Sequence, residues 1–279
     1  MKIIKNIRIQ GSRQRDIYID LFVPETKIKA PVIVFSHGFK GFKDWGHFNL
    51  LAKNFCRENF IFIKFNFSYN GTNSDHLDDV YDKEAFGHNN LSTELNDLGC
   101  IIDFIFSQNF PAKEGFNSEL YLIGHSRGGA ISILKAAEDR RVKKVLTLAA
   151  VNQFGKFFSE AIVNEWKLKG VHYVENARTK QHYPMYFQYI EDLERNAERL
   201  NVNEALNKMK AALLIIHGTY DEAVNVKSAY KIKEMKPEAE LILIDNANHT
   251  FGAKHPWDSD ELPDYTKFWF EKAIAFFRL

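Results

Sequence analysis

The sequence predicts an α/β fold with a mainly parallel sheet and helices on both faces of that sheet. Segments of strand length alternate with segments of helical spacing along most of the 279 residues, which is typical of parallel α/β architectures. The runs at 32–36 and 60–66 are almost continuously apolar, as expected of strands buried on both faces. Residues 3–23 instead alternate around Gly11-Ser12, which predicts a hairpin of antiparallel strands at one edge.

The other elements follow from the same spacing arguments. Apolar residues such as Leu95, Leu98 and Ile102 recur at helical intervals. Helices are predicted at about 48–59, 91–107, 130–138 and 265–277, and strands at 120–123, 142–150, 211–216 and 241–244. The polar loop that begins at Asn70 contains a charged stretch, 75–84, which we expect to be a solvated surface rather than a metal site.

Composition excludes several classes of function. The formal net charge is +1, so no overall field attracts nucleic acid or acidic lipid. The N-terminal residues have no apolar run of signal-peptide or membrane-spanning length. Cys56 and Cys100 lie in predicted helices without metal-site spacing, which indicates reduced thiols. We therefore expect a cytoplasmic protein that binds neither nucleic acid nor membrane and needs no metal.

About sixty residues, 151–210, separate two predicted strands, which is too long for a simple crossover. We expect a small cap above the carboxyl ends of the strands, and a core formed by 1–150 and 211–279. The cap should contain an amphipathic stretch at 154–166, a short hairpin at 171–174 and a helix at 186–200. Its aromatic residues are expected to form the cap's own core, although some could line a pocket for an apolar or aryl acyl group: Phe154, Phe157, Phe158, Trp166, Tyr173, Tyr183, Tyr186, Phe187 and Tyr189.

Ser126 lies in a Gly-x-Ser-x-Gly sequence between the strand at 120–123 and the helix at 130–138. A serine at such a strand-to-helix turn has a tight, strained backbone that exposes its hydroxyl above the sheet. Gly124 and Gly128 remove side chains that would collide across the turn. Ser126 is therefore the candidate nucleophile.

A serine hydroxyl needs an imidazole to accept its proton and a carboxylate to orient that imidazole. Asp221 and His249 each follow a predicted strand and come after Ser126 in the order Ser, Asp, His. The carboxyl ends of the strands are the edge where open α/β sheets place their sites. Asp245 and Glu222 are rival carboxylates. Asp221 is the preferred candidate because it lies just past a strand end.

The tetrahedral intermediate of such a reaction needs two backbone N–H donors. The residue after the nucleophile, Arg127, supplies one, and the loop after the strand at 32–36 supplies the other, where Phe39 is the expected donor. The Phe39 side chain is a candidate pocket wall, and the Arg127 side chain a candidate ion pair under the cap.

Other polar residues near these motifs have expected structural roles. His37 should shape its loop, His125 should pack under the turn at Ser126, and His217 should order the loop of Asp221. Lys40 and Lys43 could meet an anionic substrate, but we expect both to be solvated.

Four segments together resemble the α/β-hydrolases of the dienelactone-hydrolase-like and cinnamoyl (feruloyl) esterase-like branch: 36–41, 124–129, 217–221 and 248–251. The resemblance covers nearly the whole chain and implies an α/β-hydrolase fold with a mainly parallel eight-stranded sheet. It also implies a Ser-His-Asp hydrolase that acts on carboxylic esters without a cofactor. Dienelactone hydrolases proper have a cysteine where this chain has Ser126, and haloalkane dehalogenases need a carboxylate there.

The sequence thus predicts a serine esterase whose partner is a small-molecule ester. An aminopeptidase or acylpeptidase could use the same three residues, with Glu191, Asp192 and Glu194 as the acidic residues that leave this alternative open. A binding protein on an inactive hydrolase fold is a second alternative, although such proteins usually lack one of the three. Substrate-binding residues and oligomeric state are not predicted.

Overall fold

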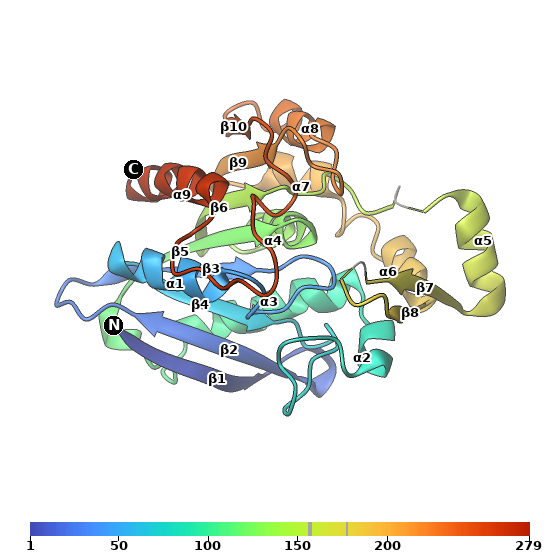
Figure 1. Ribbon diagram of the computed structural model, residues 1–279, viewed down its shortest axis with the longest axis horizontal. Coiled ribbons are helices and arrows are strands. Elements are labelled where there is room, and N and C mark those ends of the chain that lie inside the picture. The colour runs from blue at the N-terminus through green and yellow to red at the C-terminus, as the bar shows by residue number, and fades with distance from the viewer. Residues whose placement is uncertain (156–157, 177) are drawn as a thin grey trace.

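A computed structural model describes residues 1–155, 158–176 and 178–279. Its main sheet has eight strands in the order β1-β2-β4-β3-β5-β6-β9-β10, and a separate hairpin pairs β7 with β8 (Figure 1). The strands of the main sheet are β1 (Lys2–Gln10), β2 (Asp16–Val23), β3 (Ala30–Ser36), β4 (Ile61–Asn66), β5 (Phe116–His125), β6 (Val142–Leu148), β9 (Ala212–Gly218) and β10 (Glu240–Ile244). β2 is antiparallel to both β1 and β4, and the remaining pairs are parallel, so the predicted fold class and edge hairpin are confirmed.

Helices cover both faces of this sheet. They are α1 (Phe48–Arg57), α2 (Lys83–Gly87), α3 (Leu91–Phe106), α4 (Arg127–Glu138), α5 (Glu160–Lys169), α6 (Gln188–Arg195), α7 (Val202–Lys208), α8 (Lys227–Met235) and α9 (Asp264–Arg278). Because side chains alternate along a strand, Val32 and Val34 pack in one apolar cluster with α3, α4, α7 and α8, whereas Ile33 and Phe35 pack in the other with α1 and α9. This two-sided burial explains the continuous apolar runs.

Two predicted elements differ from the observed ones, and one observed helix in the polar loop was not predicted. The strand predicted at 142–150 ends at Leu148, because Ala149 has φ 51°. The helix predicted at 186–200 spans Gln188–Arg195, because Tyr186 pairs with Val171 in the hairpin. The five-residue helix α2 in the polar loop was not predicted, and Asp82 caps it by accepting a hydrogen bond from the Ala85 N–H.

The segment 151–210 contains α5, the hairpin of β7 (Val171–Glu175) with β8 (His182–Tyr186), α6 and α7. In Figure 1, α5, the hairpin and α6 project to one side of the main sheet. Trp166 is fully buried at their centre, with ring centres 5.2 Å from Phe158, 6.0 Å from Tyr189 and 6.3 Å from Phe187. These aromatic residues form the core of the segment, as expected, but Tyr173 is exposed and does not belong to it. Phe157 lies outside the described residues.

Both cysteines are free thiols, Cys56 buried in α1 and Cys100 half-buried in α3. Burial raises the pKa of Cys56 to about 11, so this thiol is unreactive at neutral pH. None of the helices in the described part of the chain is long and apolar enough to cross a bilayer.

Candidate active site

Ser126 occupies the turn between β5 and α4 with φ 55° and ψ −120°, the strained geometry that the motif predicts. A Cβ on Gly124 would lie 2.3 Å from the Gly128 carbonyl oxygen, and a Cβ on Gly128 would lie 2.3 Å from that of Ser36. Only glycine fits at either position. The turn is tied to its neighbours because the Ser126 N–H donates to the Leu148 carbonyl at 2.8 Å.

Asp221 and His249 are hydrogen-bonded to each other: His249 Nδ1 lies 2.8 Å from Asp221 Oδ2. Oδ1 of Asp221 accepts the N–H groups of Ala223 and Val224 at 2.9 and 2.8 Å, so the carboxylate is held at both oxygens. Burial alone would raise the pKa of Asp221, but hydrogen bonds from His217 and His249 outweigh it and hold that pKa well below its usual range. Asp221 is therefore charged and oriented toward His249.

His217 supports this carboxylate from inside the protein. Its Nε2 lies 3.2 Å from Asp221 Oδ2 and 2.8 Å from the Val224 carbonyl oxygen, and its side chain is fully buried. Both contacts bridge β9 to the loop that follows it, the ordering role expected from the sequence. The rival carboxylates Asp245 and Glu222 are exposed, and neither forms a hydrogen bond with His249 among the described residues.

His125 contacts the candidate base directly, which the sequence did not predict. Its Nε2 lies 2.8 Å from the His249 carbonyl oxygen, and the two ring centres are 4.7 Å apart. Burial lowers the pKa of His125 to about 3, so the ring is neutral and Nε2 donates to that carbonyl. The position of His125 at a strand end, directly before Ser126, is the only sequence signal that could have indicated this contact.

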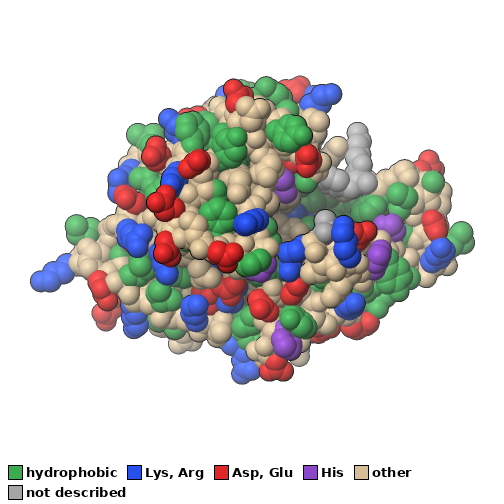
Figure 2. Space-filling view, in the orientation of Figure 1, with side chains coloured by type: hydrophobic (Ala, Val, Ile, Leu, Met, Phe, Trp, Pro, Cys, Tyr) green, Lys and Arg blue, Asp and Glu red, His purple; other side chains and the backbone are tan. Residues whose placement is uncertain are grey.

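Ser126 and His249 line one cleft of about 480 Å³ together with the loop 37–48 that follows β3. The space-filling view shows this face hollowed between the main body and the projecting segment, with Lys and Arg side chains at its border (Figure 2). A Cβ on Gly38 would lie 3.0 Å from the Ser126 Cβ, so the loop backbone touches the turn at Ser126. Neither the Phe39 N–H nor the Arg127 N–H donates a hydrogen bond to another described residue.

The Arg127 side chain lies beneath the projecting segment, between the loop, α3 and α6. Its Nη1 is 3.2 Å from Glu94 Oε1 on α3, and both side chains are nearly buried. The guanidinium carbon lies 4.0 Å from the centre of the Phe39 ring and 5.5 Å from that of Tyr189. Burial raises the pKa of Glu94, opposed by the charge of Arg127. The Arg127 side chain therefore joins the loop that carries Phe39 to α3 and α6.

Lys43 belongs to a buried group of four charges, so the expectation that it is solvated is wrong. Its Nζ lies 2.9 Å from Asp20 Oδ2 on β2, and the same oxygen lies 2.6 Å from Nζ of Lys64 on β4. Lys64 and Lys43 both also contact Asp44. The backbone directs Lys43 inward because its N–H donates to Asn66 Oδ1 at 2.6 Å. The group anchors the loop 37–48 to the sheet.

Phe39 lines the cleft, as predicted for a pocket wall, but the other residues of its walls were not predicted. Their aromatic side chains come from the loop 37–48 and the start of α1, not from the described aromatic residues of 151–210: Phe39, Phe42, Trp45 and Phe48. Three cationic residues also line the cleft, namely Lys40, Arg178 and Lys254. The aromatic residues at every third position of 39–48 were the available signal.

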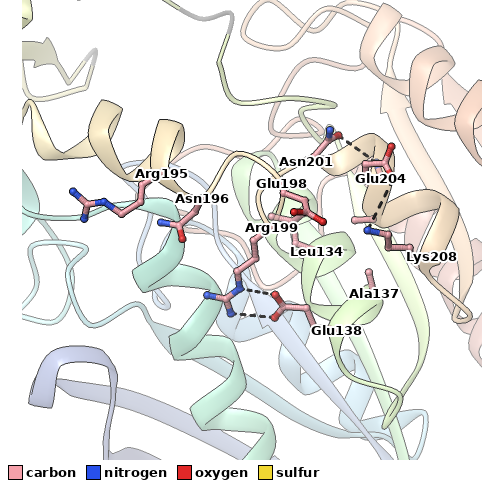
Figure 3. Close-up of a pocket in the computed structure, with 11 residues that line it drawn as sticks. Leu134, Ala137, Glu138, Arg195, Asn196, Glu198, Arg199, Asn201, Glu204 and Lys208 are labelled. Atoms are coloured by element: carbon pink, nitrogen blue, oxygen red, sulfur yellow. Dashed lines mark hydrogen bonds and ion pairs between the residues drawn. The ribbon is translucent and has the colours of Figure 1, made fainter.

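A second hollow, of about 360 Å³, lies between the end of α4 and residues 195–208 (Figure 3). Surface ion pairs line it, such as that of Arg199 with Glu138, in which Nε and Oε1 are 2.6 Å apart. None of the predicted site residues lines it. Among the described residues, no group of His, Cys, Asp and Glu side chains is arranged to hold a metal ion.

No family model and no curated protein matches this sequence. Solved structures do match along the whole chain. The esterase domain from Rhodothermus marinus has 19% sequence identity and a TM-score of 0.66, and covers 100% of this chain and 98% of its own. Est1E from Butyrivibrio proteoclasticus, with ferulic acid bound, has 17% identity and a TM-score of 0.73 over 98% of each chain.

The complex of DcsB with its substrate analogue has 16% identity and a TM-score of 0.74 over 99% of each chain. At these identities the similarity concerns the fold. With an eight-stranded sheet of the observed order and a serine at the turn after β5, this chain has the α/β-hydrolase fold.

Proposed function

We propose that the protein is a serine hydrolase that cleaves carboxylic esters through an acyl-enzyme. The observation that carries this proposal is the hydrogen bond from His249 to Asp221, because His249 lines the same cleft as Ser126. A nucleophile on a strained turn, an imidazole and a buried, charged carboxylate are the three parts that acyl transfer needs. Their chain order, Ser, Asp, His, is the one usual for this fold.

In this mechanism His249 Nε2 accepts the proton of Ser126 as the serine oxygen attacks the ester carbonyl carbon. The carbonyl π electrons move to the oxygen, and Asp221 stabilises the imidazolium through Nδ1. When the tetrahedral intermediate collapses, the ester C–O bond breaks and His249 returns the proton to the leaving alcohol. Water then repeats the same steps on the acyl-enzyme, releasing the carboxylic acid and restoring Ser126.

The N–H groups of Phe39 and Arg127 are the donors that would hold the developing oxyanion. Their lack of other partners among the described residues, and the contact of Gly38 with the turn of Ser126, support this role. Loss of one such donor typically costs about 3 kcal/mol of transition-state stabilisation.

An ester substrate fits the cleft better than a peptide with a free N-terminus. An aminopeptidase needs a carboxylate to bind the substrate ammonium, and no Asp or Glu is among the described residues that line the cleft. Est1E is described with ferulic acid bound, and the aromatic wall of this cleft suits an aryl ester as well. The presence of all three triad residues argues against an inactive binding protein.

We further propose that the protein is cytoplasmic, in agreement with its free Cys56 and Cys100. Residues 151–210 would act as a cap that limits access to the cleft, and the partner would be a small-molecule ester.

Covalent labelling of the serine tests this function. A fluorophosphonate should modify wild-type protein at Ser126, located by mass spectrometry of the peptides, and should not modify Ser126→Ala. Rates on para-nitrophenyl acetate should exceed rates on aminoacyl anilides by several orders of magnitude. Absence of labelling, or labelling at another serine, would contradict the proposal, and faster cleavage of the anilides would indicate a peptidase.

A further inference from the structure

We propose that the natural ester carries a carboxylate group, which binds to Lys40 and Lys254 beside the catalytic serine. This inference rests on the proposed function and concerns the substrate class of the same cleft. The lining of the cleft contains Lys40, Arg178 and Lys254, and no Asp or Glu among the described residues. A cleft of one charge sign concentrates ligands of the opposite sign.

Lys40 directly follows Phe39, one of the predicted oxyanion donors, in the chain. Its backbone is left-handed, with φ 60°, a conformation that a lysine rarely adopts and that sets the direction of this half-buried side chain. Nζ donates to the Glu175 carbonyl oxygen at 2.8 Å and forms no ion pair with a described carboxylate. Two further Nζ hydrogen atoms remain for a ligand.

The environment of Lys40 is short of negative charge. Burial and the charge of Arg127 both lower the pKa of Lys40, opposed by Glu175. An ammonium held in this way gains from an anion placed beside it, because the anion replaces lost hydration and offsets the repulsion by Arg127.

Lys254 is an exposed cation on the other part of the same lining, five residues after His249. It forms no ion pair with any described carboxylate, whereas Arg178 is neutralised by Asp79, with Nη2 and Oδ2 2.5 Å apart. Lys40 and Lys254 therefore supply the unneutralised positive charge, and Arg178 contributes hydrogen-bond donors rather than net charge.

The lining also has an apolar part, with Phe39, Phe42 and Trp45 on the loop that carries Lys40. A ligand that matches both surfaces has an apolar or aromatic body and one anionic group. A carboxylate beside an aryl ester meets this description, and it is compatible with a cavity of about 480 Å³.

Matched ester pairs test this inference. In the first pair the charged group lies on the alcohol part of the ester, and para-acetoxybenzoate is compared with para-acetoxybenzamide. In the second pair it lies on the acyl part, and the monomethyl ester of terephthalic acid is compared with its neutral amide. In at least one pair kcat/KM should be about tenfold higher for the carboxylate at low salt, and the ratio should fall as salt screens the charges. Equal or lower kcat/KM for the carboxylate in both pairs would overturn the inference while leaving an esterase.

Charge-neutral variants locate the effect. Lys40→Gln and Lys254→Gln should each reduce the carboxylate-to-amide ratio about threefold, as expected for a partly exposed ion pair. Lys53→Gln removes an exposed positive charge on α1, outside the cleft, and should leave the ratio unchanged. A ratio that neither cleft variant changes, or that Lys53→Gln reduces equally, would contradict the assignment of Lys40 and Lys254.

Protection of the serine provides a measurement that needs no turnover. A neutral fluorophosphonate inactivates wild-type protein while para-hydroxybenzoate or para-hydroxybenzamide competes for the cleft. The carboxylate should protect at about a tenth of the amide concentration, and Lys254→Gln should reduce this difference. Equal protection would overturn the inference, whereas failure of the fluorophosphonate to react at all would overturn the proposed esterase instead.

Discussion

The guanidinium of Arg127 lies 4.0 Å from the centre of the Phe39 ring, so the side chains of the two residues proposed as oxyanion donors are in contact. The same guanidinium is paired with Glu94 on α3. The residue directly after Ser126 therefore helps to fix the loop that carries Phe39. The backbone N–H and the side chain of Arg127 have different proposed roles, and a substitution that changes only the side chain separates them.

Arg127→Met keeps the N–H donor but removes the stacked cation and the ion pair. We expect kcat to fall about 10- to 100-fold with a much smaller change in KM, because the oxyanion exists only in the transition state. Steady-state kinetics on para-nitrophenyl acetate measure both constants. Arg199→Met removes a surface ion pair in the second hollow and should change neither. A change in KM alone would show that Arg127 binds substrate rather than positioning the loop.

Asp221→Asn should lower kcat by about 10⁴-fold, because an amide cannot stabilise the imidazolium and favours the wrong tautomer of His249. Asp245→Asn and Glu222→Gln change the rival carboxylates and should keep activity within about twofold. All three variants are compared in the same ester assay. If Asp245→Asn were the inactive variant, the assignment of Asp221 would be wrong.

Asp20→Asn should destabilise the fold by about 3–5 kcal/mol, because it leaves Lys43 and Lys64 buried beside the single carboxylate of Asp44. The free energy of unfolding in urea measures this loss. Asp16→Asn on the same strand breaks only an exposed contact to Arg8 at 3.5 Å and should cost less than about 1 kcal/mol. Equal costs would show that the buried charges contribute no more than surface charges.

His47 should make stability depend on pH. Burial lowers its pKa from 6.5 to about 4 in the folded protein. The unfolded chain therefore binds the proton more readily, and the stability present above pH 6.5 is lost as the pH falls toward 4. The loss is about 3 kcal/mol, at 1.36 kcal/mol for each pKa unit. The free energies of unfolding in urea are compared at pH 7 and pH 4 for the wild type and for His47→Gln. The variant should lack this part of the pH dependence. An identical dependence in the variant and the wild type would contradict the role of His47.

The sequence predicted the sheet, its edge hairpin and the places of Ser126, Asp221 and His249 because these depend on local patterns. A strand buried on both faces is continuously apolar, and a strained turn requires glycine at fixed positions. The helix α2 and the exact end of β6 were missed because a capping aspartate and a single left-handed Ala149 decide them.

Contacts between distant segments could not be predicted. Lys43 is buried because Asp20 and Lys64 lie on neighbouring strands, a relation that only the sheet order creates. The contact of His125 with the His249 carbonyl likewise joins residues far apart in sequence. A lysine or histidine in isolation carries no signal of such partners, so the solvated state was the natural expectation for Lys43.

The initial rate of para-nitrophenyl acetate hydrolysis by Ser126→Ala, relative to wild type, tests the proposed mechanism most directly. The variant has no nucleophile, and we expect a loss of about 10⁶-fold, to the level of the background reaction. Its urea unfolding should match that of the wild type, which shows that the fold is intact. Retention of a tenth or more of the wild-type rate by the folded variant would show that Ser126 is not the nucleophile.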